Sequence, residues 1–300
     1  DVLGSRGLGD VYKRQYMPYD RIETDFKMIR DAGMNVIRIA ESTWSTWEPK
    51  EGVFDFTHLH RMLDCAAKYE LKVIVGTPTY AVPSWLAKKY PDILAVTHNG
   101  KELYGHRQNM DITNPDYLHH AQIIIEKLME QVKDYDCVIG FQLDNETKPY
   151  DTCSKYAQAK FVEYLKNEFP DIDEFNREFG LDYWSNRVDD WDAFPDIRGT
   201  INMSLDAEYK KFQRKLVTDF FAWQADIVKK YKRDDQFITH NFDFEWHDYS
   251  YGMQPEVNQY EAAKCMDIAG CDIYHPSQSN LSGRETVSYT HLTLPTNSLV

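Results

Sequence analysis

Short apolar runs alternate with amphipathic segments along the chain, and this alternation limits the fold more than any other feature. The apolar runs have strand length and are rich in Val and Ile, as in strands buried on both faces of a parallel sheet. The segments between them repeat with the period of a helix. The predicted strands are residues 35–40, 71–76, 137–143, 236–240 and 271–274, and the predicted helices are residues 20–32, 57–69, 83–89, 115–133, 155–168, 206–231 and 260–266.

Strands and helices that alternate in this way form βα units around a parallel sheet. We therefore expect an α/β fold, a (β/α)8 TIM barrel that is incomplete and contains about the first six βα units. A closed barrel needs eight strands, whereas five are clear here and a damaged first strand is expected near residues 12–17. The acidic, Trp-containing segment 171–200 breaks the rhythm and is interpreted as an insertion on the barrel.

Three local signals refine these elements. Gly33 is expected to close the first helix, because glycine adopts the left-handed conformation of a helix C-terminus. Thr57 is expected to be the N-cap of the second helix. Residues 93–111 are expected to form a long loop.

The two ends of the chain do not fit the sequence beside them. Residues 7–15 read GLGDVYKRQ and residues 287–297 read VSYTHLTLPTN, and both resemble translated sequencing-adaptor read-through at the ends of metagenomic fragments. We therefore expect residues 1–15 and 287–300 to be non-native. The natural chain is then a single catalytic domain at residues 16–286, truncated before the last strands; the alternative for the C-terminal end is a native polar tail.

Charge and cysteine content restrict the partners. The formal net charge of −14 disfavours nucleic acid and anionic membrane surfaces, because both are polyanions. No apolar run reaches the ~18 residues of a membrane span, and residues 1–15 lack the apolar core of a signal peptide. Five cysteines without metal-site spacing indicate free thiols in a reducing compartment. We expect a cytoplasmic protein that binds a neutral substrate.

Polar residues follow each predicted strand, at the end of a barrel where active sites lie. Asn145 and Glu146 come directly after the apolar run 137–143. Hydrolysis of a glycosidic bond needs a carboxylic acid that protonates the leaving oxygen, and a neighbouring amide can hydrogen-bond the sugar 2-OH. We therefore predict Glu146 as the proton donor and acid/base, and Asn145 as a substrate-binding residue. Asn-Glu is a common dipeptide, so the prediction depends on its position directly after an apolar strand.

The end of the first predicted strand supplies three further substrate-binding candidates, Arg38, Glu41 and Trp44. Glu41 is expected to orient Arg38 or a water in the pocket; the alternative is a structural carboxylate. Trp44 is expected to form a pocket wall, because aromatic rings offer apolar faces to sugars, although most tryptophans pack in cores. His240 and His275 are interpreted as hydrogen-bonded residues rather than metal ligands.

Four long segments then resemble a known family. They resemble segments of glycoside hydrolase family 42, the β-galactosidases, and occur in the same order as in that family. The resemblance covers about residues 16–285. The resemblance implies a retaining enzyme that hydrolyses terminal non-reducing β-D-galactosyl residues of galactosides or oligosaccharides by double displacement and without a cofactor. The segments are VIRIAESTWSTWEPKEGVFDF (36–56), VIVGTPTYAVPSWLAKKYPDIL (73–94), GHRQNMDITNPDY (105–117) and IGFQLDNE (139–146).

The resemblance also implies residue roles. The family's acid/base is the Glu of an Asn-Glu pair after the fourth strand, which falls on Glu146, and the preceding Asn145 binds the substrate. The first Arg of the family's Arg-Arg-His-Tyr-Cys segment falls on Arg107, which is therefore expected to bind the substrate; the alternative is an ion pair with a surface carboxylate. Family members form trimers, so the parent protein is expected to be a homo-oligomer.

The sequence departs from the family in two places. Asp111 stands where the zinc-binding members have a cysteine, and the Cys cluster after the acid/base is reduced to Cys153, so no metal is expected. The family's nucleophilic Glu lies at the end of the seventh strand, and the resemblance stops before that strand. Glu285 follows no predicted strand and is not assigned. The nucleophile is therefore expected to be absent from this chain.

Three alternatives stay open. One is α-L-arabinopyranosidase activity, whose sugar differs from galactose only in lacking the hydroxymethyl group. Another is a different barrel glycosidase of the same clan, because the WEPKEG stretch at residues 47–52 recurs there. The last is a catalytically inactive fragment, which the foreign-looking ends favour.

Overall fold

The central element is a sheet of five parallel strands in the order β1-β2-β5-β6-β9. Each strand pairs with the next one along the chain, which is the order of a TIM barrel. The computed structural model describes residues 19–105, 109–199, 201–243, 246–247, 250–251 and 256–272, so the predicted non-native ends and the predicted strand near residues 12–17 lie outside it. The strands are β1 (Val36–Ile39), β2 (Lys72–Gly76), β5 (Val138–Gln142), β6 (Phe237–Phe242) and β9 (Ile268–Cys271).

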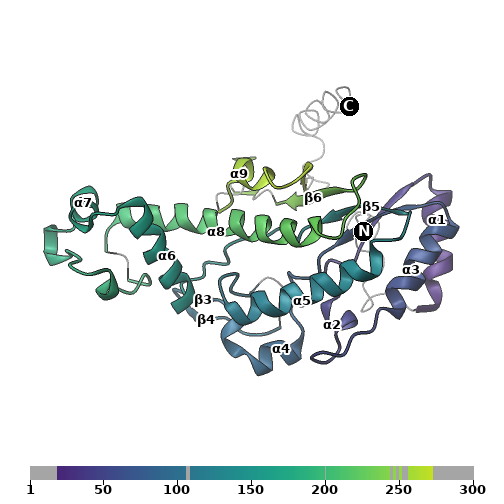
Figure 1. Cartoon of the computed structure of the whole chain (residues 1–300), viewed down its shortest axis with the longest axis horizontal. Coiled ribbons are helices and arrows are strands. Elements are labelled where there is room, and N and C mark those ends of the chain that lie inside the picture. Colours follow the sequence, from purple (N-terminus) through teal and green to yellow (C-terminus); the bar gives the residue numbers. More distant parts are fainter. Residues whose placement is uncertain are drawn as a thin grey trace.

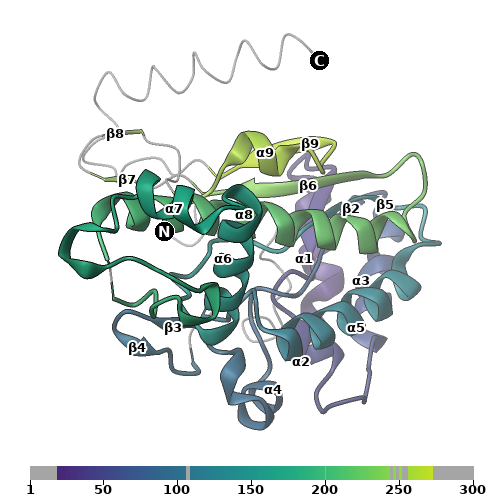
Figure 2. The same cartoon turned by 60° about the vertical axis from the view of Figure 1, so that its left-hand side comes forward.

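Helices connect consecutive strands and cover one face of the sheet. In Figures 1 and 2, α5 and α8 lie side by side on this face, and they contact each other. Polar residues start these helices as N-caps: the Asn114 side chain accepts from the Tyr117 N–H at the start of α5, and Asn202 accepts from Leu205 at the start of α8. The connecting helices are α3 (Thr57–Lys68), α5 (Pro115–Val132), α8 (Met203–Lys229) and α9 (Gln259–Ala263), and α1 (Ile22–Asp31) precedes β1.

The two faces of the sheet differ in burial. Val73 and Val75 of β2 are at most 1% exposed, on the face that the helices cover. Burying such a side chain contributes about 1.5–3 kcal/mol. On the opposite face, Arg38, Ile74 and Thr239 are only half-buried. In a closed barrel this second face lines the interior and is filled by side chains. Because it is only half-buried here, the described strands form an open part of a barrel.

The remaining elements decorate this sheet. Two short antiparallel pairs, β3 with β4 and β7 with β8, stand apart from it. None of the described helices is both long enough and apolar enough to cross a membrane. The other elements are η1 (Tyr19–Arg21), α2 (Trp44–Trp47), α4 (Ser84–Lys89), η2 (Pro91–Ile93), β3 (Val96–Thr97), β4 (Gly100–Lys101), α6 (Lys155–Glu168), α7 (Ile172–Glu178), η3 (Tyr183–Ser185), η4 (Trp191–Ala193), β7 (Trp246–His247) and β8 (Ser250–Tyr251).

Three sequence predictions need correction. Thr57 is not an N-cap: it is the first residue of α3, and its N–H donates to Asp55 Oδ1 at 3.0 Å. The loop predicted at residues 93–111 contains the β3–β4 hairpin. The last strand begins at Ile268, three residues earlier than predicted, because its backbone pairs in register with β6 from Thr239 onward. The prediction for Gly33 is confirmed, since it closes α1 at φ +79°.

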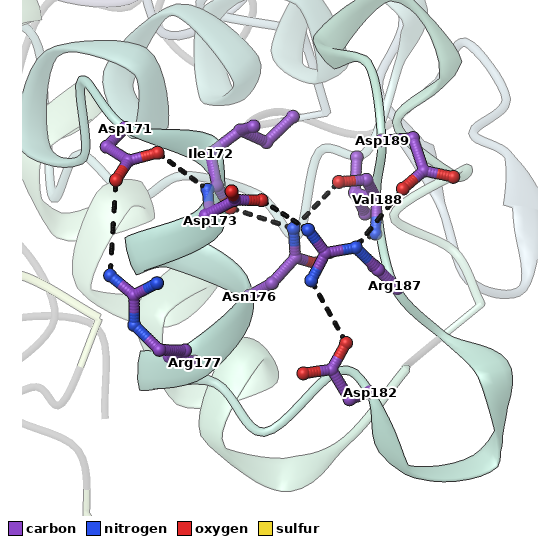
Figure 3. A network of polar contacts seen from close by, with 9 residues as sticks. All are labelled: Asp171, Ile172, Asp173, Asn176, Arg177, Asp182, Arg187, Val188 and Asp189. Carbon is purple, nitrogen blue, oxygen red and sulfur yellow. Dashed lines mark hydrogen bonds and ion pairs between the residues drawn. The ribbon is translucent and has the colours of Figure 1, made fainter.

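The predicted insertion at residues 171–200 forms a separate group of short helices near the start of α8, away from the sheet (Figure 1). Figure 3 shows its polar contacts. The Arg187 guanidinium donates to Asp173, to Asp182 at 3.1 Å and to Asp189 at 3.2 Å. Asn176, which is fully buried, bonds the backbone N–H and carbonyl of Val188 at 2.8 and 2.7 Å. These contacts tie the loop that follows α7 back onto that helix.

Candidate active site

The predicted acid/base lies on a sharp turn just beyond β5. The backbone of Leu143 is held by β6, because its N–H donates to the Thr239 carbonyl at 2.9 Å and its carbonyl accepts from His240 Nδ1 at 2.6 Å. The chain then turns through two left-handed residues, Asp144 at φ +47° and Glu146 at φ +44°. This conformation takes Glu146 out of the strand and leaves its side chain buried, with 7% of the residue exposed.

Asn241, at the end of β6, joins the parts of this turn. Its Nδ2 donates to Asn145 Oδ1 at 3.1 Å and to Asp272 Oδ2 at 2.7 Å. Its Oδ1 accepts from the Glu146 N–H at 3.4 Å. One amide side chain therefore holds Asn145 and the backbone of Glu146 together at the carboxyl end of the sheet.

The buried carboxylate of Asp144 directly precedes Asn145 and Glu146 in the chain. Asp144 Oδ1 accepts from the Thr79 hydroxyl at 2.6 Å, and Oδ2 accepts from the Thr147 hydroxyl at 2.5 Å. Burial raises the pKa of Asp144 to about 6, although these hydrogen bonds favour its ionised form and lower the pKa. The Asp144 N–H also donates to Thr77 Oγ1 at 2.6 Å, so both the side chain and the backbone of this residue are held.

The candidates from the first strand end approach the same region. Arg38 Nη1 donates to Gln142 Oε1 at 2.5 Å, and its Nε lies 3.5 Å from Glu41 Oε1. Glu41 rests directly on β2: a Cβ added at Gly76 would stand 2.6 Å from the Glu41 Cβ. Only glycine at position 76 leaves room for this carboxylate, which faces Arg38 as predicted. Their contact with a substrate remains a prediction.

Trp44 lies in the core. It is fully buried, its indole N–H donates to Glu48 Oε2 at 2.9 Å, and its ring lies 6.4 Å from that of Tyr117. Burial raises the pKa of Glu48, and the bond from Trp44 opposes this shift. The covered indole has no face that a sugar can reach in this structure, so the prediction of a pocket wall gains no support from it.

His240 is a hydrogen-bonded residue, as the sequence suggested. Burial lowers its pKa to about 3, so its ring is neutral at ordinary pH and donates from Nδ1 to the Leu143 carbonyl. Its ring packs against Phe221 of α8 at 4.3 Å. Arg107, His275 and Glu285 lie outside the described residues.

The residues at the family's zinc positions make other contacts here. Asp111 is fully buried, and its Oδ1 accepts from the N–H and hydroxyl of Thr113 at 2.8 and 2.6 Å. The Cys153 thiol donates to the Val96 carbonyl at 3.0 Å, and burial raises its pKa to about 11. Within the part of the chain that the structure describes, no three His, Cys, Asp or Glu side chains gather as a metal site would require.

Sequence reasoning missed the roles of Asn241 and Asp272. Both follow an apolar run, and Asn241 belongs to the set of polar residues at strand ends. That position is the only signal in the sequence, because their partners lie 31 to 96 residues away along the chain.

Comparisons with known proteins show the family of the chain. The family model for glycoside hydrolase family 42, described as beta-galactosidase, matches residues 11–294. The chain is 30% identical over 277 residues to a beta-galactosidase of Thermus thermophilus, which covers 89% of the chain. It is 28% identical over 282 residues to beta-galactosidase BgaA of Clostridium cellulovorans, which covers 93% of it. The chain spans 41% of the length of each relative.

Solved structures give the same result. A catalytic mutant of Gan42B, a family 42 β-galactosidase from G. stearothermophilus, superimposes with a TM-score of 0.81 at 27% identity, over 87% of this chain and 38% of Gan42B. The β-galactosidase from Bacillus circulans sp. alkalophilus gives a TM-score of 0.80 at 26% identity, over 90% of this chain and 40% of its own. The five parallel strands are thus part of a TIM barrel, and the chain belongs to glycoside hydrolase family 42.

Proposed function

We propose that the protein carrying this chain is a retaining β-galactosidase with Glu146 as its acid/base. The observation that carries the proposal is the buried turn after β5, where Asn241 holds Asn145 and Glu146 together. The relatives from Thermus thermophilus and Clostridium cellulovorans are named beta-galactosidases, and this supports the choice of a terminal β-D-galactosyl residue as the substrate.

Glu146 serves both halves of the reaction. It protonates the leaving oxygen in the first step and removes a proton from the attacking water in the second. Because Asn145 Oδ1 accepts from Asn241, a contact between Asn145 and the sugar 2-OH uses the Asn145 Nδ2 as donor. Arg38 and Arg107 are the proposed cationic contacts of the sugar.

Retention also requires a second carboxylate about 5 Å from Glu146. We propose that this nucleophile lies outside the described residues. The test therefore supplies the remaining strands of a family 42 barrel.

The test uses a hybrid in which the C-terminal part of Gan42B follows Asp272. We expect the hybrid to release nitrophenol from 4-nitrophenyl β-D-galactopyranoside. In the hybrid, Glu146→Gln should lower turnover of the phenyl galactoside by roughly 10²–10⁴-fold. The kcat/KM of the 2,4-dinitrophenyl galactoside should fall much less, because kcat/KM reports the first step and that leaving group departs without a proton; kcat falls for both substrates, because the second step still needs Glu146 as the base.

Equal losses of kcat/KM on both substrates would show that Glu146 is not the acid of the first step. A folded hybrid that cleaves the 4-nitrophenyl α-L-arabinopyranoside or β-glucoside faster than the galactoside would overturn the proposed substrate. Inactivity of the hybrid with every glycoside would refute the function itself.

A further inference from the structure

Four buried residues form a closed ring of hydrogen bonds behind the turn that carries Glu146. The Asp144 N–H donates to Thr77 Oγ1 at 2.6 Å, and this hydroxyl donates to Gln224 Oε1 at 2.6 Å. Gln224 Nε2 donates to Thr79 Oγ1 at 3.0 Å, and that hydroxyl donates to Asp144 Oδ1 at 2.6 Å. The ring thus begins at the backbone of Asp144 and ends at its carboxylate.

The ring leaves little freedom to its members. All four residues are at most 1% exposed, so water cannot replace a lost partner, and a buried polar group without one is costly. Each hydroxyl accepts one bond and donates the next, and such chains of bonds strengthen one another in a low-dielectric interior. Gln224 comes from α8, whereas the two threonines follow β2 and Asp144 follows β5.

The ring acts on a strained piece of backbone. Asp144 and Glu146 both have positive φ angles, and residues other than glycine keep this conformation only where their surroundings enforce it. Asp144 is held from four sides: by Thr77 at its N–H, by Gln142 Nε2 at its carbonyl at 2.9 Å, and by two hydroxyls at its carboxylate. On the far side of the turn, Asn241 supplies a longer bond of 3.4 Å to the Glu146 N–H.

We propose that this ring positions the acid/base, with Asp144 and Gln224 as positioning residues for Glu146. Gln224 has no role in the chemistry and lies on an outer helix, yet it closes the ring that fixes Asp144, two residues before Glu146. The role of Glu146 as the acid/base rests on the proposed function. The effect of the ring on the turn does not, because the geometry of the turn is measurable without a substrate.

The experiment compares Gln224→Leu with Gln213→Leu in the 300-residue chain. Gln213 is a matched control: it lies on the same helix, is also buried, and its side chain bonds Tyr209 rather than the ring. Amide hydrogen exchange is followed by NMR, together with the side-chain carboxyl 13C shift of Glu146, assigned with Glu146→Gln. We expect Gln224→Leu to speed exchange of the amides at residues 144–147 about tenfold and to move the Glu146 shift. Gln213→Leu should do neither.

Two variants of Asp144 sharpen the comparison. Asp144→Ala removes the end of the ring and should behave like Gln224→Leu. Asp144→Asn keeps an oxygen that accepts from Thr79, so exchange of the amides at residues 144–147 should stay as slow as in the unsubstituted chain. Should Gln224→Leu fail to fold, the comparison is made at the other hydroxyl of the ring, with Thr77→Ser, which retains that hydroxyl, and Thr77→Val, which lacks it.

The proposal would be overturned if both glutamine variants altered the amides of the turn equally. It would also be overturned if Gln224→Leu increased the amide exchange rates of α5 and α8 as much as those of residues 144–147. A Glu146 carboxyl 13C shift that did not change in Gln224→Leu would overturn it as well. Failure of the hybrid to cleave galactosides would count against the proposed function alone, since these measurements involve no turnover.

Discussion

Two polar networks of this molecule are each built around one ionised side chain, and they differ in burial. Asp144 is 1% exposed and is held by neutral hydroxyl groups. Arg187 has a side chain that is 39% exposed and is held by three carboxylates. Charge pairs in water are screened and contribute little, whereas buried polar groups depend on every partner. The network with fewer charges should therefore matter more for stability.

The largest effect is expected at Thr79. Thr79→Val removes the donor to the buried Asp144 carboxylate and the acceptor of Gln224 Nε2. Leaving both groups without these partners should cost about 4 kcal/mol of unfolding free energy, measured by urea unfolding near neutral pH. Thr218→Val is the control, because the half-buried Thr218 hydroxyl donates only to the Arg214 carbonyl of its own helix at 3.3 Å. Equal losses in the two variants would contradict the importance of the ring.

The next effect is a pH dependence of stability. Burial raises the pKa of Asp144 from its ordinary 3.8 to about 6, so the folded protein holds this proton more tightly than the unfolded chain. The resulting stabilisation is complete below about pH 4 and is lost as the pH rises through about 6, and it amounts to roughly 3 kcal/mol. Asp144→Asn cannot ionise and should lack this component. Urea unfolding across this range tests it, and parallel profiles for the two proteins would refute it.

A smaller effect is expected inside the insertion, at a buried residue. Asn176→Ala removes three hydrogen bonds to the backbone of Ile172 and Val188 and should cost about 2 kcal/mol of local stability. Hydrogen exchange of α7 and the following loop measures this loss. Exchange in the strands of the sheet should stay unchanged, and an effect there would show that the insertion is coupled to the barrel.

The smallest effect is expected at Arg187 itself. Arg187→Ala removes the three ion pairs that Arg187 makes in Figure 3, yet the urea midpoint should move less than in Asn176→Ala. The difference from the wild-type chain should vanish in about 1 M NaCl, where charges are screened within about 3 Å. A salt-independent loss larger than that of Asn176→Ala would reverse the comparison between burial and charge.

Much of the fold could be predicted from the sequence. Residues 155–168 form α6 with the predicted bounds, and four of the five predicted strands overlap their observed counterparts along most of their length. The hydrophobic period is a local property, so it is readable without a structure. The last strand was misplaced because its start depends on pairing with β6, and the hairpin inside the loop at residues 93–111 is too short to produce a periodic signal.

The candidate site was predictable only in part. Asn145 and Glu146 were found because chemistry in a barrel follows the strand ends. Trp44 was predicted as a pocket wall, whereas the structure buries it against Tyr117 and Glu48. The sequence alone does not distinguish an aromatic residue after a strand whose ring faces a ligand from one whose ring faces the core.

The sequence by itself determined the parallel α/β architecture, the place of Glu146 at the end of a strand and its Asn145 neighbour. Only the tertiary structure decided what holds them. Gln224 reaches Thr77 and Thr79 across 147 and 145 residues of chain, and Asn241 reaches Asn145 across 96. Bonds over such separations depend on how strands and helices pack. The left-handed backbone of Glu146 depends on those bonds, because a glutamate has no local preference for it, whereas an aspartate such as Asp144 adopts it more readily.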